Sequence, residues 1–217
     1  FEIKRFDQIK FSRNKIKSSF ANDLLKNKNF DLVFFDSWKS IEHFNGTNQI
    51  KKICLIHGNE ILNLKKKERI IKSLKKVDKV LFNSNFTKNL FHKQLPELSD
   101  LPSMVIFPAF IENINYTDDE KKYDLCTIAR LEYRKGHHLV LEALSKLKNE
   151  KNLIFTYAIL GDGPELSKLK DLVTKNNLLH QVDFISNKNS SEVYKQSKIH
   201  VMPTITTPDS IEGFGIS

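Results

Sequence analysis

Short apolar runs alternate along the chain with segments whose apolar residues repeat at helical spacing. Runs rich in β-branched and aromatic residues predict strands at residues 31–35, 53–56, 79–82, 105–107, 125–129, 153–160, 182–185 and 199–202. Helical spacing predicts helices at residues 64–77, 84–91, 140–147, 164–173 and 190–196, with Ser84 as an N-cap and Pro164 in a first turn. Strands alternating with helices predict an α/β fold with parallel sheets buried on both faces.

One polar, charged segment without periodicity, residues 112–122, interrupts this alternation. It predicts a linker between two Rossmann-like domains, residues 1–112 and 113–217. Two α/β domains joined in this way usually bind their ligand in a cleft between them, at the carboxyl ends of the strands.

The charge is distributed unevenly. Residues 1–112 carry 21 Lys and Arg against 12 Asp and Glu, an excess of nine, whereas residues 113–217 carry 14 of each. A basic first half suits an anionic partner such as lipid headgroups, a phosphorylated acceptor or nucleic acid, although a Lys- and Asn-rich background gives the same count without any partner. No recognition-helix pattern accompanies the charge, so nucleic acid is not predicted.

No apolar run approaches the ~20 residues of a membrane-spanning helix. The two cysteines, Cys54 and Cys126, lie in apolar runs without partners at metal-ligand spacing. These features predict a reducing, cytoplasmic location and no metal site. The first residues, FEIKRFDQIKF, resemble neither a secretory signal nor a natural start, so we expect an incomplete chain.

Four segments at predicted strand ends carry candidate chemistry. ARLEYRKG places Arg130 and Lys135 between a strand and a helix, where they suit a diphosphate, although solvated loop cations look the same. LGDGPEL contains Gly161, whose freedom allows either a close ligand or a plain turn. LIHGNE places His57 before a glycine at another strand end.

EGFGIS is the fourth segment, and it combines a carboxylate with glycines around an aromatic residue. Such a loop can offer backbone N–H groups and a hydroxyl acceptor to a sugar, although a Gly-rich turn over a buried Phe is the alternative. Its candidate residues are Glu212, Gly213, Phe214 and Gly215.

Taken together, the segments ARLEYRKG, ILGDGPEL, EGFGIS, LIHGNE and VDKVLFNSNFTKN resemble the group 1 family of retaining glycosyltransferases, which are family-4-like and have the two-Rossmann GT-B fold. The resemblance implies that Arg130 and Lys135 bind the diphosphate of a nucleotide-sugar donor. It also implies that Glu212 binds hydroxyls of the transferred hexose, that the backbone of residues 213–215 lies against sugar and phosphate, and that His57 lies near the reacting sugar. The strand end at Ile185 would border the base.

The same resemblance implies transfer with retention of configuration, no metal or other cofactor, and a glycan or lipid-linked acceptor. The basic first half would fit a lipid-borne acceptor and peripheral association with the inner face of the membrane. A Gly-rich loop that the family carries near its beginning has no match before Asp31, and the family's ribose-binding Glu would fall at position 220, past Ser217. Both departures predict an incomplete GT-B fold. The alternatives are a sugar-nucleotide epimerase of the same fold and a non-catalytic protein that binds a sugar nucleotide or an anionic partner.

Overall fold

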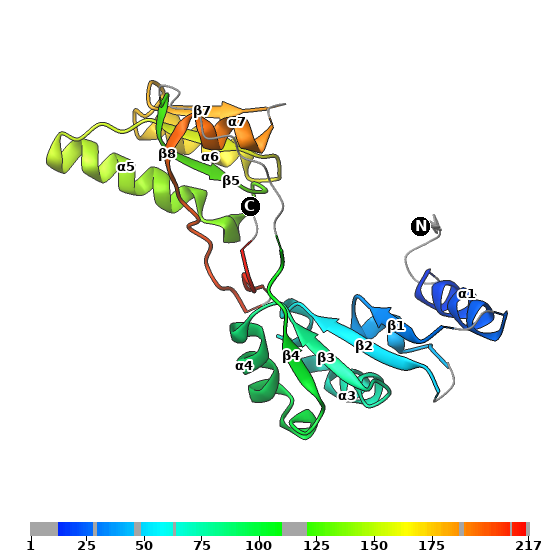
Figure 1. Ribbon diagram of the computed structural model, residues 1–217. Coiled ribbons are helices and arrows are strands. Elements are labelled where there is room, and N and C mark those ends of the chain that lie inside the picture. The colour runs from blue at the N-terminus through cyan, green and yellow to red at the C-terminus, as the bar shows by residue number, and fades with distance from the viewer. Residues whose placement is uncertain are drawn as a thin grey trace. The chain divides into compact units, whose positions relative to one another are not determined.

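The computed structural model describes residues 13–27, 30–45, 49–62, 64–109, 121–186, 189–208 and 210–215. The chain divides into two compact units, Phe1–Ala109 with Pro208–Phe214, and Phe110–Thr207 with Gly215–Ser217. Each unit contains a four-stranded parallel sheet, so the expected α/β fold with two parallel sheets is confirmed (Figure 1). Most of the expected linker, residues 112–120, lies outside the described residues.

The first unit runs through four strands in sequence order, β1-β2-β3-β4 (Figure 1). Its elements are α1 (Arg13–Asn27), β1 (Leu32–Phe35), α2 (Trp38–Ile41), β2 (Lys51–Ile56), η1 (Asn59–Ile61), η2 (Leu64–Lys66), α3 (Lys67–Leu74), β3 (Lys79–Phe82), α4 (Asn85–Gln94), η3 (Pro96–Leu98) and β4 (Ser103–Val105). The Ser84 cap is confirmed, since its Oγ accepts a hydrogen bond of 3.1 Å from the Thr87 N–H.

Strand order explains which face of this sheet is buried. Parallel strands joined by right-handed crossovers in one direction place every connecting helix on the same face. One core accordingly joins side chains of β1–β3 to those of α2, α3 and α4, among them Ile56, Phe82 and Phe91. On the strands' other side Leu32, Phe34 and Met104 remain about half exposed. Among the described residues, the expectation of burial on both faces therefore fails at the edge strands β1 and β4, whereas Leu81 of β3 is buried on this face.

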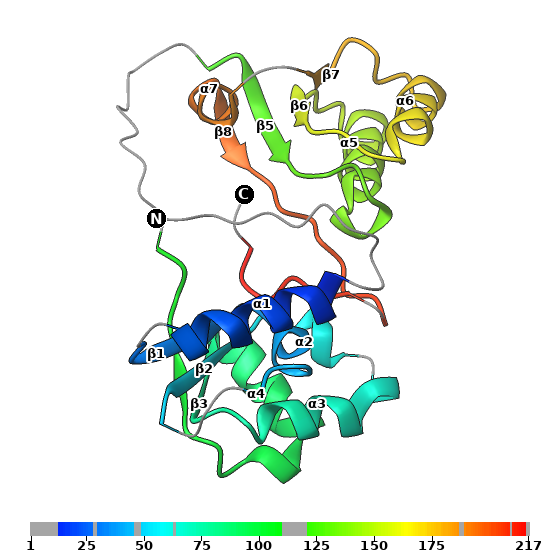
Figure 2. The same cartoon turned by 90° about the vertical axis from the view of Figure 1, so that its right-hand side faces the viewer.

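The second unit has the strand order β7-β6-β5-β8. The chain adds β5, β6 and β7 in one direction and then returns to place β8 on the other side of β5. Its elements are β5 (Tyr123–Ile128), η4 (Tyr133–Lys135), α5 (His137–Lys151), β6 (Tyr157–Leu160), α6 (Leu166–Lys175), β7 (Val182–Ile185), α7 (Ser190–Lys195) and β8 (Ser197–His200). Because the last crossover runs the other way, α7 lies on the face opposite α5 and α6, as Figure 2 shows. Helices therefore cover both faces of this sheet, although Ile199 of the edge strand β8 stays 58% exposed.

Several boundaries differ from the sequence prediction. Pro164 lies in a turn before α6, whose first residue is Leu166. The strand predicted at 153–160 begins only at Tyr157, because Leu153 and Ile154 stay exposed in an extended connection. Helices α1 and α2 were not predicted, since neither carries a long apolar stripe. No helix in the described part of the chain is long and apolar enough to cross a membrane.

Candidate functional site

The loop after β5 lies where the strand order of the second sheet reverses. Arg130 follows the end of β5 at Ile128, and β5 separates β6 from β8. In an open α/β sheet the adjacent crevice, outside the carboxyl ends of the strands, is the usual ligand site. The topology therefore places Arg130 where this unit can best receive a ligand.

A carboxylate that sequence reasoning missed holds the Arg130 side chain. Arg130 Nη1 lies 2.6 Å from Glu132 Oε1, and Arg134 Nε lies 3.2 Å from Glu132 Oε2. The Arg130 side chain is 69% exposed, so water screens this ion pair and an arriving phosphate can compete with the carboxylate. The sequence contained one sign of this ion pair, because Glu132 is the single acidic residue among the three cationic residues of ARLEYRKG.

Lys135 ends η4 and stands immediately before the amino terminus of α5. Gly136 connects the two with φ = 71°, a left-handed conformation that favours glycine. The first N–H groups of a helix lack intrahelical acceptors and carry partial positive charge, so this terminus adds to the attraction of an anion. Arg130, Lys135 and the start of α5 thus belong to one cationic loop.

The GDGP turn packs directly against this loop. The Leu131 N–H donates to Asp162 O at 2.8 Å, and the Glu165 N–H donates to Leu131 O at 3.0 Å. A Cβ added at Gly161 would lie 1.9 Å from the carbonyl oxygen of Ala129. Gly161 is therefore required because a side chain at this position would clash with the backbone of the neighbouring loop. The sequence alone did not reveal this packing.

Replacing Gly161 with alanine is expected to destabilise the protein by about 1–2 kcal/mol, because the added Cβ meets backbone that cannot rotate away. Urea unfolding followed by circular dichroism measures the effect. Pro164→Ala, at an exposed position of the same turn, is the control and should cost less, about 0.4–1 kcal/mol, because it only restores freedom to the unfolded chain. Equal stability of Gly161→Ala and the native chain would contradict the close packing of the two loops.

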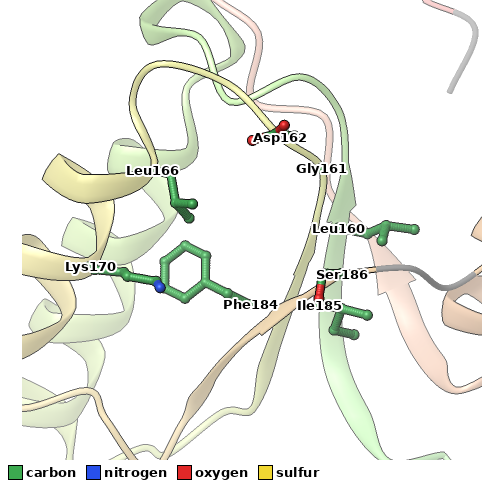
Figure 3. A pocket seen from close by; sticks show the side chains of 8 residues that line it. All are labelled: Leu160, Gly161, Asp162, Leu166, Lys170, Phe184, Ile185 and Ser186. Atoms are coloured by element: carbon green, nitrogen blue, oxygen red, sulfur yellow. The ribbon is translucent and has the colours of Figure 1, made fainter.

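A pocket of about 470 Å³ opens beside this turn, at the carboxyl ends of β6 and β7 (Figure 3). It brings together two residues expected at the donor site, Gly161 and Ile185. The other lining residues are Leu160, Asp162, Leu166, Lys170, Phe184 and Ser186. In the close view the Phe184 ring points toward Leu166 and Lys170, and Lys170 Nζ lies 5.9 Å from the ring centroid. A flat apolar surface beside polar groups suits a heteroaromatic ring.

The Ile185 side chain points the other way. Successive residues of a strand face opposite sides of the sheet, so Ile185 and Leu160 lie on the face away from Phe184 (Figure 3). There both pack against the cluster that contains Val193 of α7. Within this pocket Phe184, which sequence reasoning missed, therefore supplies the aromatic surface.

In the first unit, His57 directly follows β2 and is exposed, so the core does not enclose it. The His57 N–H donates to Glu60 Oε1 at 2.7 Å, which fixes the turn after the strand. This placement agrees with a side chain that emerges at a strand end. The role of His57 stays a prediction.

Residues 210–214 lie against the same strand ends of the first unit. The Ile211 N–H donates to Asn59 Oδ1 at 2.8 Å, and Ser84 Oγ–H donates to the Gly213 carbonyl at 2.6 Å. A Cβ at Gly213 would lie 2.5 Å from the carbonyl oxygen of His57. Gly213 and the adjoining Glu212 therefore lie beside His57, whereas the sequence assigned them to the second domain, facing His57 across a cleft.

The rest of this segment is less enclosed. Phe214 is 41% exposed, with its ring centroid 6.2 Å from that of Phe107, and Gly215 groups with the second unit. Asn59 and Ser84 were missed as residues that hold this segment. Their only signal was their position just after predicted strands, and a contact between residues 84 and 213 leaves no trace in local patterns.

Comparison with known proteins identifies the class to which this arrangement belongs. Residues 111–217 match the family model described as "Glycosyl transferases group 1". An uncharacterized glycosyltransferase of Methanocaldococcus jannaschii is 28% identical over 171 residues, which cover 77% of this chain and 45% of that protein. WcaL of Escherichia coli K12, a candidate colanic acid biosynthesis glycosyltransferase, is 32% identical over 98 residues, or 43% of this chain and 24% of that protein.

Among solved structures, the pneumococcal O-GlcNAc transferase GtfA in complex with UDP and GlcNAc superimposes with a TM-score of 0.66 at 17% identity. The match covers 92% of this chain and 42% of that one. Residues 111–217 thus match the group 1 glycosyltransferase family, and the chain has the GT-B type of fold. It spans less than half the length of these three relatives.

Proposed function

We propose that this protein transfers a hexose-type sugar from a nucleoside-diphosphate donor to a glycan or lipid-linked acceptor, with retention of configuration and without a metal cofactor. One observation carries the proposal. The cationic loop of Arg130 and Lys135 and the pocket at Gly161 belong to one unit and are joined by the hydrogen bonds of Leu131. In this assignment the base occupies the pocket and the diphosphate reaches the cations.

The fold of the pneumococcal transferase, solved with UDP and GlcNAc, supports a nucleotide-sugar donor. In the proposed reaction the acceptor hydroxyl oxygen bonds to the anomeric carbon while the bond from that carbon to the diphosphate oxygen breaks. The bonding electrons leave with the diphosphate, which also takes up the hydroxyl proton. Arg130, Lys135 and the start of α5 stabilise this negative charge, which is the part a metal ion plays in other transferases.

The sugar is assigned to residues 212–215 and His57. A carboxylate such as Glu212 accepts hydrogen bonds from sugar hydroxyls, and a glycine backbone lets a sugar approach closely. The contacts of Gly213 with Ser84 and with the His57 backbone support this grouping, because they bring the glycine loop to the strand end that His57 follows.

The test is incubation with UDP-, GDP- and ADP-hexoses and a panel of glycan and lipid-linked acceptors, with products identified by mass spectrometry and NMR. A product with the donor's anomeric configuration supports the proposal, and an inverted product contradicts retention. An epimerase would instead convert the donor sugar without any acceptor. A non-catalytic binding protein would bind a nucleotide diphosphate and form no product.

His57→Ala is expected to lower turnover by about 10-fold or more while donor affinity changes little, because the imidazole is assigned to the sugar and not to the nucleotide. Initial rates at saturating donor measure turnover, and calorimetric titration with the nucleotide measures affinity. His180→Ala, at an exposed position of the second unit, is the matched control. Unaltered turnover in His57→Ala would remove His57 from the site.

A further inference from the structure

A second pocket, of about 200 Å³, lies in the first unit. Its lining comes from three neighbouring elements. Trp38 and Lys39 begin α2, Glu60 lies in η1, and Lys65 and Lys66 end η2. Nothing assigned to the donor lines this pocket.

The charges around this pocket favour an anion. Three ammonium groups and one carboxylate line it, and the Glu60 carboxylate already accepts the His57 N–H at 2.7 Å. The adjacent Arg69 and Glu42 satisfy each other through hydrogen bonds of 2.6 and 2.8 Å. The ammonium groups repel one another, and a bound anion would offset this repulsion because it attracts each of them.

Trp38 lines the same pocket. Its side chain is 1% exposed, and its Nε1–H has no acceptor among the described residues. Indole nitrogen is only a donor, and leaving a buried donor unpaired costs about 1–3 kcal/mol. This nitrogen is shielded from solvent, so a ligand in the pocket would act on it through the side chains that line the pocket.

We propose that this pocket binds a phosphate group carried by the acceptor substrate. The inference rests on the proposed function, which assigns the donor diphosphate to the second unit, so that a phosphate bound to the first belongs to the other substrate. The volume is roughly seven times the ~30 Å³ that a water molecule occupies in the liquid, which admits a phosphate and part of the group it esterifies. Through Glu60 the pocket adjoins the His57 turn, so it holds the acceptor near the residue assigned to the sugar.

The sequence offers a direct probe, because Trp38 is its single tryptophan. Titration of the ¹⁵N-labelled chain with glycerol 3-phosphate, followed through the one indole N–H signal, reports on this pocket alone. We expect a saturable shift with glycerol 3-phosphate and none with glycerol. If neither glycerol 3-phosphate nor phosphatidylglycerol vesicles produce a saturable shift, the proposal is overturned.

Paired variants separate the pocket from general surface charge. Lys65→Gln with Lys66→Gln removes two pocket cations, and Lys72→Gln with Lys75→Gln removes two exposed lysines of the same region that do not line it. The pocket variant should bind glycerol 3-phosphate about tenfold more weakly, and the control should bind it as the native chain does. Equal weakening in both variants overturns the proposal, because attraction would then come from the whole surface.

Vesicles distinguish the two sources of the phosphate. If phosphatidylglycerol vesicles shift the indole signal and free glycerol 3-phosphate leaves it unchanged, the acceptor is borne by a lipid. Phosphatidylcholine vesicles are the neutral control. A response to the free compound identifies a soluble acceptor. Donor binding is measured separately by titration with UDP, GDP and ADP. Phosphate binding without sugar transfer would refute the proposed function alone, and transfer without phosphate binding would refute this inference alone.

Discussion

Replacing Arg130 with alanine is expected to lower the rate of sugar transfer by about 100-fold or more. The guanidinium can donate two parallel hydrogen bonds to a phosphate, and its charge offsets the charge that accumulates on the departing diphosphate. Because that charge is greatest in the transition state, the loss should appear in turnover more than in donor affinity. Steady-state kinetics with the donor identified for the protein measure both.

Two further variants sharpen this result. Arg130→Lys keeps the charge but loses the paired donors, so it should recover part of the lost rate. Lys146→Ala, at an exposed position of α5, removes one positive charge from the same unit and should leave the rate unchanged. An unaltered rate in Arg130→Ala would contradict the leaving-group role.

His137 by itself is expected to lower the free energy of unfolding by about 2–3 kcal/mol as the pH falls from 6.5 to about 4. Burial, assisted by the charges of His138 and Lys135, lowers the pKa of His137 from 6.5 to about 4. The side chain is 1% exposed, and neither ring nitrogen has a hydrogen-bond partner among the described residues.

The sign follows from which state takes up the proton. Above pH 6.5 the imidazole is neutral in both states. Below it the unfolded chain is protonated first, so unfolding is favoured until the folded chain is also protonated near pH 4. Urea unfolding at several pH values should show that His137→Leu abolishes this part of the slope without lowering stability at pH 7. His180→Leu controls for loss of an exposed imidazole, and an unchanged slope in His137→Leu would contradict the prediction.

Local patterns sufficed for much of the fold. Strand β3 and strand β7 have the predicted limits, and the Ser84 cap forms as expected, because buried runs and caps depend on neighbouring residues in the chain. The position of Arg130 after a buried strand was also readable, since a parallel sheet delivers its strand ends to one edge. The sequence therefore predicted the family that residues 111–217 match and the position of the loop that carries Arg130.

Other features depended on contacts between distant segments. Whether a sheet is covered on one face or two follows from strand order, which the periodicity of single elements does not encode. Phe184 and Lys170 share a pocket because a strand and the preceding helix pack together, and Gly161 is small because the backbone of Ala129 lies against it.

Residues 208–214 show the same limit most clearly. By position they belong with the second half of the chain, yet Asn59 and Ser84 hold them on the first unit by hydrogen bonds across more than 120 positions. Hydrophobic spacing reports the burial of each element but not the partner that buries it. The sequence by itself thus determined most of the strands and the family that its second half matches, whereas packing of distant backbone groups decided which candidate residues lie together.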